Sequence, residues 1–316
     1  MHRDQASGGL RHAVSLYRTA GQYTTAIDQF VSDGQARHEP VWLALAVGQL
    51  PPGGAASRWP QATVADMRQL GGNPARIMPA IRAFADDHTG LRVRCISEPV
   101  WPDRPAAEMR EAARHDALLN LAFAGTPLSV MCLYDAGALP GSAIADACGS
   151  HPSRLSGQQL STNRDYLGDG SMPASLGKPL VAPPGARELR YERDLRPVRS
   201  LVAAFAAEAG LSVTRRTDLV IAASEVSANT LRHTRAGGVI RLWATDDSVL
   251  CQIDDSGHIA DPLAGHVRPS ADRPGGQGLW LVNQICDLAE IRTSELGTTV
   301  RLCMHRDNDP GIRVES

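Results

Sequence analysis

With 316 residues, the chain is long enough for two domains of ordinary size. Its formal net charge of −2 provides no basic excess to neutralise phosphates, which argues against a general nucleic-acid binder. The longest apolar run, residues 41–47, is too short to cross a bilayer. Neither direct nucleic-acid binding nor membrane insertion is therefore expected.

The cysteines and the N-terminus indicate the compartment. The six cysteines are widely spaced and contain no C-x-x-C pair, so we expect neither a zinc motif nor a secreted disulfide framework. The opening residues MHRDQASGGLRH lack the apolar region of a signal peptide. These features predict reduced, mostly buried thiols in a cytoplasmic protein.

The first half alternates strand-like and helical patterns. Strands are predicted at 41–47, 91–97 and 128–134, and helices at 75–88 and 106–124. Such alternation is typical of an α/β domain with a mostly parallel sheet.

Several stretches of this half resemble the MEDS sensory domain, which occurs fused to ATPase domains in actinobacterial regulators. They are HAVSLYRTAGQY, NPARIMPAIRAF, EPVWPDRPAAEMREAARHDALLNLAF, and MCLYD with the later HP. The resemblance covers residues 10–152 and implies a RecA-like three-layer α/β domain. After the first predicted strand the chain reads GQLPPGGAAS, without the Gly-Lys-Ser/Thr of a phosphate loop, so P-loop chemistry is not expected.

A sensory ligand or partner surface remains open for this half. The candidate residues are polar or amphipathic: Glu98, Trp101, His115, Asn120 and Tyr134. For each of them a satisfied internal hydrogen bond is the plainer alternative. Cys95 and Cys132 fall in predicted core strands, where burial is favoured over redox sensing.

A stretch rich in Gly, Pro and Ser, residues 160–187, predicts a linker. It separates a sensory domain at 1–159 from a second domain at 188–308, which is followed by a tail at 309–316. The predicted elements of the second domain form an α+β unit, with helices at 194–209, 215–233 and 278–289 and strands at 239–245, 249–255 and 298–304.

The helix at 215–233 carries Glu225, Asn229 and His233 at four-residue spacing. Four residues advance the helix face by only about 40°, so the three side chains form one stripe beside an apolar arc. This stripe either holds a ligand or is a solvated polar edge, and the pattern by itself leaves both open.

Two further motifs follow this helix along the sequence. Alternation along the strand VLCQIDDSG places Asp255 on the face of the apolar residues, with Gly257 two positions on. That carboxylate could accept from an adenine amine or cap the next loop through backbone N–H groups. Gly275, Gly276 and Gly278 then precede a helix, where backbone N–H groups can approach an anion. The order and spacing of the three pieces indicate a nucleotide site.

Residues 188–305 resemble the ATPase domain shared by histidine kinases, type II topoisomerases and bacterial anti-sigma-factor serine kinases. The matching motifs are ASEVSANTLRH, IDDSGH, GGQGLWLV and GTTVRL, and the opening helix is most similar to the serine kinases. The resemblance implies a Bergerat-type α/β sandwich that binds ATP and Mg²⁺.

The same resemblance implies roles for individual residues. Asn229 would ligate Mg²⁺, Glu225 would orient or deprotonate the attacking hydroxyl, and His233 would serve structure. Asp255 would accept from the adenine amine, and Gly257 would let the base approach. The remaining positions are Gly276 and Gly278, which would line the phosphates, and Thr299, which would hydrogen-bond near the adenine. Ile259 stands where many relatives carry a second glycine, which favours ATP binding over fast turnover.

These expectations combine into a cytoplasmic transcription regulator of anti-sigma-factor type, which binds a sigma factor or a STAS-type anti-sigma antagonist and phosphorylates the antagonist on Ser or Thr. The alternative is a non-catalytic partner-binding module that keeps the ATPase fold. A histidine kinase is disfavoured because His151-Pro152 ends a domain instead of starting a dimerisation hairpin. A homodimer is expected only by analogy with sigma-factor kinases.

Overall fold

The computed structural model describes residues 8–46, 54–156, 159–169, 171–234, 236–269 and 276–306. The chain forms two compact units, Met1–Gly177 and Lys178–Ser316. Within the described residues, no helix combines the length and the apolar character needed to cross a membrane.

The first unit is built on a sheet of seven strands within the described residues, in the order β3-β2-β4-β5-β1-β6-β7. All neighbouring strands run parallel except the edge pair β6–β7, which confirms the prediction of a mostly parallel sheet. The strands are β1 (Arg11–Tyr17), β2 (Val41–Leu45), β3 (Thr63–Asp66), β4 (Val93–Ser97), β5 (Leu128–Asp135), β6 (Ser153–Ser156) and β7 (Gln159–Thr162).

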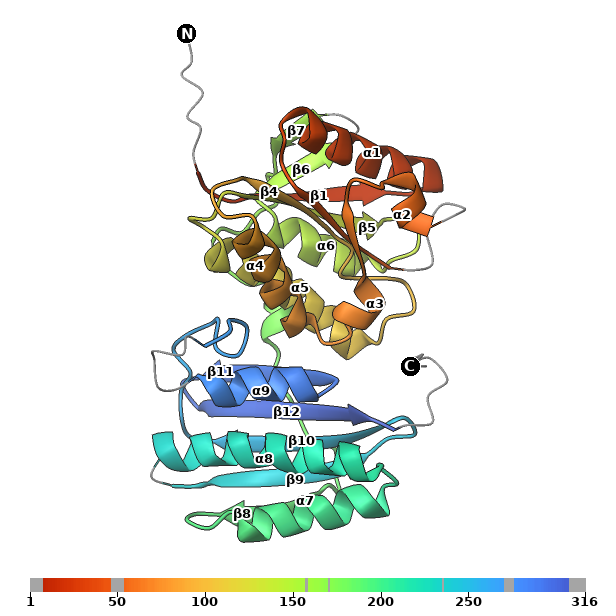
Figure 1. Cartoon of the computed structure of the whole chain (residues 1–316). Coiled ribbons are helices and arrows are strands. Elements are labelled where there is room, and N and C mark those ends of the chain that lie inside the picture. The colour runs from red at the N-terminus through yellow and green to blue at the C-terminus, as the bar shows by residue number, and fades with distance from the viewer. Residues whose placement is uncertain are drawn as a thin grey trace. The chain divides into compact units, whose positions relative to one another are not determined.

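Helices cover both faces of this sheet, which gives the expected three-layer α/β arrangement (Figure 1). Residues of α1 and α2 form one core cluster with Leu43, Ile96 and Leu133 of the central strands. On the opposite face, Trp42 stacks on Phe84 of α4 at a ring-centroid distance of 6.4 Å. The helices are α1 (Ala20–Ala36), α2 (Gly54–Arg58), α3 (Met67–Leu70), η1 (Pro74–Arg76), α4 (Ile77–Asp87), α5 (Ala106–Ala122) and α6 (Gly141–Ser150).

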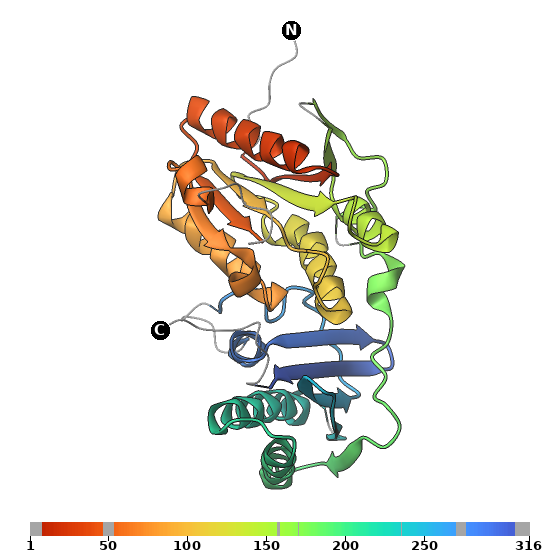
Figure 2. The ribbon, with the colours of Figure 1, turned by 90° about the vertical axis from the view of Figure 1, so that its right-hand side faces the viewer.

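The second unit is a two-layer sandwich of the expected Bergerat type. Its antiparallel sheet has the order β11-β12-β10-β9-β8, and the helices lie against one face (Figure 2). The elements are β8 (Arg187–Tyr191), α7 (Arg196–Glu208), α8 (Val213–His233), β9 (Gly238–Ala244), β10 (Ser248–Asp255), α9 (Gln277–Ile285), β11 (Leu288–Ser294) and β12 (Gly297–His305).

Alternation decides which side chains of this sheet face the helices. Val249, Cys251 and Ile253 of β10 are buried in the core cluster, together with Val300 and Leu302 of β12. The intervening residues point to the opposite face, where polar and charged side chains form cross-strand contacts.

The structure differs from the predicted elements at several points. The helix expected at 278–289 ends at Ile285, because Cys286 adopts an extended conformation and the chain continues as strand β11 against β12. Strand β2 (Val41–Leu45), expected at 41–47 as the first strand, is preceded by β1 and α1.

The expected linker 160–187 contains regular secondary structure. β7 and the 3-10 helix η2 (Ala174–Gly177) overlap residues 160–187 and belong to the first unit. Of GQLPPGGAAS, residues 48–53 lie outside the described residues.

Candidate functional site

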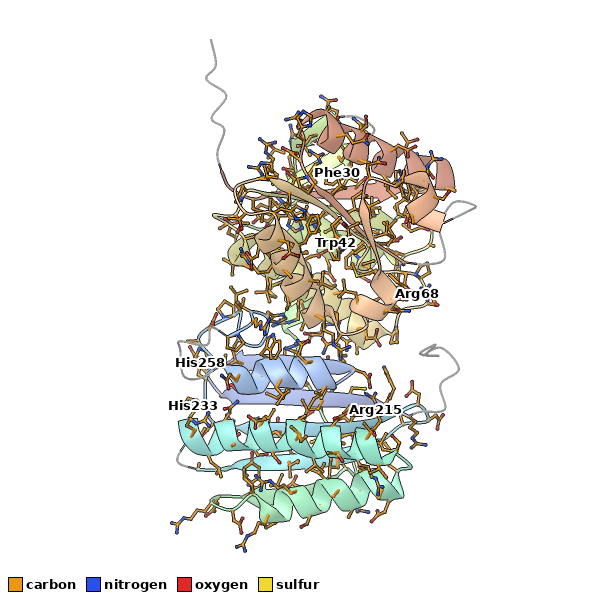
Figure 3. All side chains as sticks on the ribbon, in the orientation of Figure 1. Phe30, Trp42, Arg68, Arg215, His233 and His258 are labelled. Carbon is orange, nitrogen blue, oxygen red and sulfur yellow. The ribbon has the colours of Figure 1, made fainter. Side chains whose placement is uncertain are left out.

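Helix α8 carries the polar stripe along the edge of the core. Glu225 and Asn229 are half-buried, whereas His233 is exposed at the C-terminal end of the helix (Figure 3). Ala222 and Val226 on the adjoining arc are buried. The stripe therefore lies where the packed face of α8 meets its exposed face.

The start of α9 lies directly against this stripe. A Cβ atom on Gly278 would lie 2.9 Å from Glu225 Oε2 and 3.3 Å from Asn229 Nδ2, so any larger residue would push these two side chains aside. Gly276 caps the helix with a φ of 78°, a left-handed conformation that also favours glycine. The N-terminus of α9, whose first backbone N–H groups have no partner within the helix, is thus brought beside Glu225 and Asn229. Gly275 lies outside the described residues.

Asp255 ends β10 on the core face, as the alternation predicts. Its Oδ2 accepts a hydrogen bond from Thr230 Oγ1 at 2.6 Å, and its Oδ1 accepts from the backbone N–H of Gly257 at 2.7 Å. Loop capping by this carboxylate is therefore present in the structure. Each carboxylate oxygen has a second acceptor position, so the two bonds leave capacity for a ligand donor. Through Thr230, the end of β10 is joined to the helix that carries Glu225 and Asn229.

Thr299 does not reach this site. In the antiparallel register, Thr298 lies opposite Asp255 and Thr299 lies opposite Asp254, and opposite residues share a face of the sheet. Thr299 Oγ1 accordingly donates to Asp254 Oδ1 at 2.6 Å on the outer face. Thr298 is buried and donates to the backbone carbonyl of Gly257 at 2.9 Å. Thr298, and not the expected Thr299, is therefore the threonine on the same face as Asp255.

Arg232 is a residue of this site that sequence reasoning missed. Its Nη1 donates to Asn229 Oδ1 at 2.9 Å, so it engages the carboxamide oxygen that the resemblance assigns to Mg²⁺. The sequence could have indicated Arg232, because residues three apart on a helix are neighbours and because a guanidinium group binds phosphate well.

The segment between the two glycine motifs contacts the sheet and α9. The backbone N–H of Ile259 donates to Thr293 Oγ1 at 3.2 Å, and the buried Asn283 of α9 donates through Nδ2 to the carbonyl of Gly265 at 2.9 Å. Residues 270–275 of this segment lie outside the described residues.

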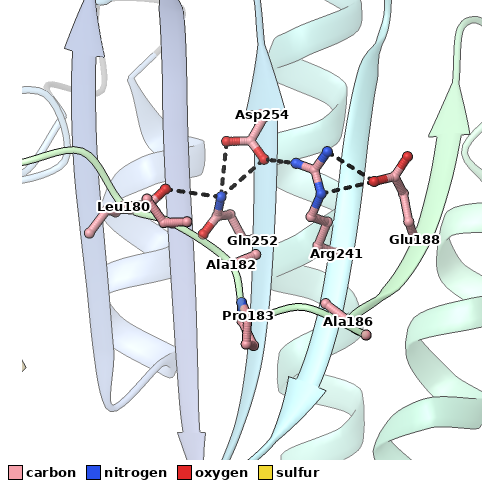
Figure 4. Close-up of a pocket in the computed structure, with 10 residues that line it drawn as sticks. Leu180, Ala182, Pro183, Ala186, Glu188, Arg241, Gln252 and Asp254 are labelled. Carbon is pink, nitrogen blue, oxygen red and sulfur yellow. Dashed lines mark hydrogen bonds and ion pairs between the residues drawn. The ribbon is translucent and has the colours of Figure 1, made fainter.

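The outer face of the sheet carries a separate cavity of about 380 Å³ (Figure 4). Arg241 bridges Glu188 and Asp254 at 2.9 and 2.6 Å, and residues 180–186 cover this network. The carboxylates here are already paired with a guanidinium, and Asp254 lies on the other side of the sheet from Asp255. We therefore interpret the network as holding the chain segment before β8 onto the sheet.

In the first unit, Glu98 lies just beyond the end of β4. Its carboxylate accepts hydrogen bonds from Tyr17 at 2.9 Å, Tyr23 at 3.2 Å and the backbone N–H of Ala46 at 2.8 Å. Burial nevertheless raises the pKa of Glu98 to about 7. Glu98 is thus a buried acid that releases its proton less readily than an exposed glutamate.

Asn120 and Tyr134 belong to one buried cluster of polar side chains. Asn120 Oδ1 lies 3.0 Å from His12 Nδ1, and Tyr134 donates to Asp116 Oδ2 at 2.5 Å. Sequence reasoning did not single out either partner. These contacts are internal hydrogen bonds, the alternative that the sequence left open.

The remaining two candidates are buried elsewhere. Trp101 lies within cation–π distance of the guanidinium groups of Arg104 and Arg68, at 4.2 and 5.2 Å from the ring centroid. His115 is fully buried on α5.

Two protein families match the chain. Residues 11–152 match the MEDS domain, described as the methanogen/methylotroph, DcmR sensory domain. Residues 189–304 match the histidine kinase-like ATPase domain. The chain thus carries an N-terminal MEDS domain and a C-terminal histidine kinase-like ATPase domain. No curated protein matches it.

Among solved structures, the RsbU and RsbW domains of a Mycobacterium tuberculosis protein match at 22% sequence identity with a TM-score of 0.29. The match covers 39% of this chain and 33% of that chain. This chain therefore spans about a third of that protein's solved chain.

Proposed function

We propose that the second unit binds Mg–ATP between α8, the end of β10 and the start of α9. One observation carries this proposal: α8 joins all three motifs. Glu225 and Asn229 lie against Gly278, and Thr230 of the same helix donates to Asp255. The match of residues 189–304 to a histidine kinase-like ATPase domain supports it independently.

The residue types suit the parts of the nucleotide. The Asn229 carboxamide oxygen and phosphate oxygens are the hard ligands that Mg²⁺ prefers, and the metal would neutralise phosphate charge when bound. When nucleotide is bound, the Arg232 guanidinium would release the Asn229 oxygen and donate to a phosphate oxygen instead. Gly276 and Gly278 bring backbone N–H groups to the phosphates at the N-terminus of α9. Asp255 would accept from the adenine amine.

Glu225 is the residue placed for phosphotransfer. Its carboxylate lies beside Gly278, at the end of α9 proposed to hold the phosphates, so it could orient or deprotonate a hydroxyl approaching them. We infer a protein serine/threonine kinase activity on a STAS-type anti-sigma antagonist. The sequence likeness of α7 to the anti-sigma serine kinases supports this choice of partner.

For the whole chain we infer a cytoplasmic regulator of transcription, in which the MEDS domain senses a ligand and the ATPase domain controls a sigma factor. The joining of these two matched domains in one chain supports this reading. Dimerisation of the ATPase domain belongs to the same hypothesis.

Calorimetric titration of the purified chain with Mg–ATP tests the proposal. We expect micromolar binding that is lost in Asn229→Ala and in Asp255→Asn. Asp254→Asn is the matched control, because it changes the neighbouring carboxylate on the opposite face of the same strand. Absence of heat at millimolar nucleotide, or equal loss in Asp254→Asn and Asp255→Asn, would contradict the proposed site.

A non-catalytic binding module is the second candidate. Two observations favour it: Ile259 replaces a second glycine, and Arg232 already engages the Asn229 oxygen. Glu225→Gln separates the two functions. A kinase loses phosphotransfer to its antagonist in this variant and keeps nucleotide binding, whereas a binding module shows no phosphotransfer in either form and controls its partner equally well in both.

A further inference from the structure

A buried cluster in the first unit combines four side chains that can each ligate a metal ion. These are His12 of β1, Asp116 of α5, Cys132 of β5 and His151, which follows α6. Each is at most 1% exposed. Their ligand atoms all lie within 4.8 Å of one another.

The sheet topology brings these residues together from distant parts of the chain. β1 lies between β5 and β6, and its register pairs Val14 with Cys132. His12 is two residues from Val14, so His12 and Cys132 point to the same face of the sheet. That face is covered by α5, which contributes Asp116. His151 precedes β6 on the other side of β1, and the two imidazole centroids are 4.1 Å apart.

Hydrogen bonds to the outer ring nitrogens assign the histidine tautomers. His151 Nδ1 lies 2.7 Å from the carbonyl of Ala147, so this nitrogen carries the hydrogen. Asn120 donates through Nδ2 to the carbonyl of Ser150 at 2.8 Å, which turns its Oδ1 toward His12 Nδ1 at 3.0 Å. His12 Nδ1 therefore carries a hydrogen as well. In both rings the Nε2 lone pair is left facing the cluster.

The contacts inside the cluster have the spacing of a tetrahedral metal site. His12 Nε2 lies 3.4 Å from Cys132 Sγ, Cys132 Sγ lies 3.8 Å from Asp116 Oδ1, and His151 Nε2 lies 3.7 Å from Asp116 Oδ2. Ligands at about 2.0–2.3 Å from a tetrahedral Zn²⁺ are separated by about 3.3–3.8 Å. Three neighbouring pairs thus have near-tetrahedral spacing, and because Asp116 makes its two contacts through different oxygens, its carboxylate would have to rotate to bind one ion.

The chemistry of the cluster also suits a divalent ion. The two imidazoles supply neutral nitrogen ligands through the Nε2 atoms, which contact Cys132 Sγ and Asp116 Oδ2. Asp116 and Cys132 are fully buried, where an isolated carboxylate or thiolate would be costly. One divalent cation would balance one thiolate and one carboxylate, leaving a neutral core.

We propose that His12, Asp116, Cys132 and His151 form a four-ligand site for a divalent transition-metal ion, with Zn²⁺ the best match to the donor set. Asn120, the Ala147 carbonyl and Tyr134 hydrogen-bond to His12, His151 and Asp116 and form the outer shell that orients these ligands. The site is independent of the nucleotide site in the second unit.

Expression of the full chain in medium supplemented with Co²⁺ or with Zn²⁺ tests the proposal, since a site this deeply buried is best loaded as the chain folds. We expect one tightly bound ion per chain. The cobalt form should show intense visible d–d bands of a tetrahedral site and a near-ultraviolet thiolate-to-cobalt band. Cys132→Ser should lose the thiolate band. Cys95→Ser is the matched control, because Cys95 is equally buried in the neighbouring strand β4.

Asn120→Leu tests the outer shell, with an expected loss of about 10- to 100-fold in Zn²⁺ affinity and retention of the thiolate band. Circular dichroism of each variant separates lost ligation from lost folding. The proposal is overturned if a folded wild-type chain contains substoichiometric metal from both media, if the thiolate band is absent or survives Cys132→Ser, or if Cys95→Ser removes it.

Discussion

Glu98 gives a quantitative prediction of how stability depends on pH. The substitution Glu98→Gln keeps the shape of the side chain and removes its titration. The carbonyl of the substituted carboxamide can accept from the backbone of Ala46 and from Tyr23, while its amide can donate to the Tyr17 hydroxyl, which is able to accept. The variant should therefore fold, and its stability should lack the contribution from the carboxyl group.

The size of that contribution follows from the pKa of Glu98, which burial raises from 4.5 to about 7 against the opposing hydrogen bonds and the Arg68 guanidinium. The folded state holds the proton more tightly than the unfolded state. The contribution of this tighter proton binding to the free energy of unfolding is fully present below pH 4.5 and is lost as the pH rises through 7. At 1.36 kcal/mol per pKa unit, the wild type should lose about 3 kcal/mol relative to Glu98→Gln across this window.

Equilibrium denaturation in guanidinium at several values of pH measures this difference. Trp42, Trp59 and Trp101 are buried in the first unit and report its unfolding by fluorescence. Subtracting the free energy of unfolding of the variant from that of the wild type at each pH removes the effect of other titrating groups, including those of the second unit. If this difference in the free energy of unfolding stays constant, or changes in favour of the wild type as the pH rises, burial does not outweigh the hydrogen bonds in setting the pKa of Glu98.

Two further predictions concern the nucleotide site, both measured by calorimetric titration with Mg–ATP. Thr298→Val should weaken binding about 5- to 10-fold by removing a buried hydrogen bond, whereas Thr299→Val on the outer face should leave the affinity unchanged, and the reverse order would contradict the assigned face. Gly278→Ala should weaken binding about tenfold, because its Cβ would displace the Glu225 carboxylate and the Asn229 carboxamide of the proposed site. Gly141→Ala, where a Cβ meets nothing within 4 Å, is the control, and equal binding by the Gly278 variant would show that the close approach is unimportant.

Local periodicity explains which parts of the fold could be predicted. The strands at 128–134 and 249–255 and the helix at 215–233 have strong patterns, and the structure places their ends within a few residues of those limits. Strand β11 was missed because its apolar residues continue the helical pattern of α9, and only pairing with β12 makes that segment a strand.

The local sequence pattern is enough to predict which side chains share a face within one element. Glu225 and Asn229 lie on one stripe because of the helical repeat, and Asp255 faces the core because of strand alternation. These relations need no knowledge of the rest of the molecule, since the backbone geometry of a single element fixes them.

The tertiary structure alone decided which elements meet. The sheet register places Thr298, and not Thr299, on the same face as Asp255, because neighbouring residues of a strand point to opposite faces. Parallel pairing placed His12 beside Cys132, which is 120 residues further along the chain. No local spacing encodes such a contact, because it depends on the order of strands in the sheet and on the helix packed over them.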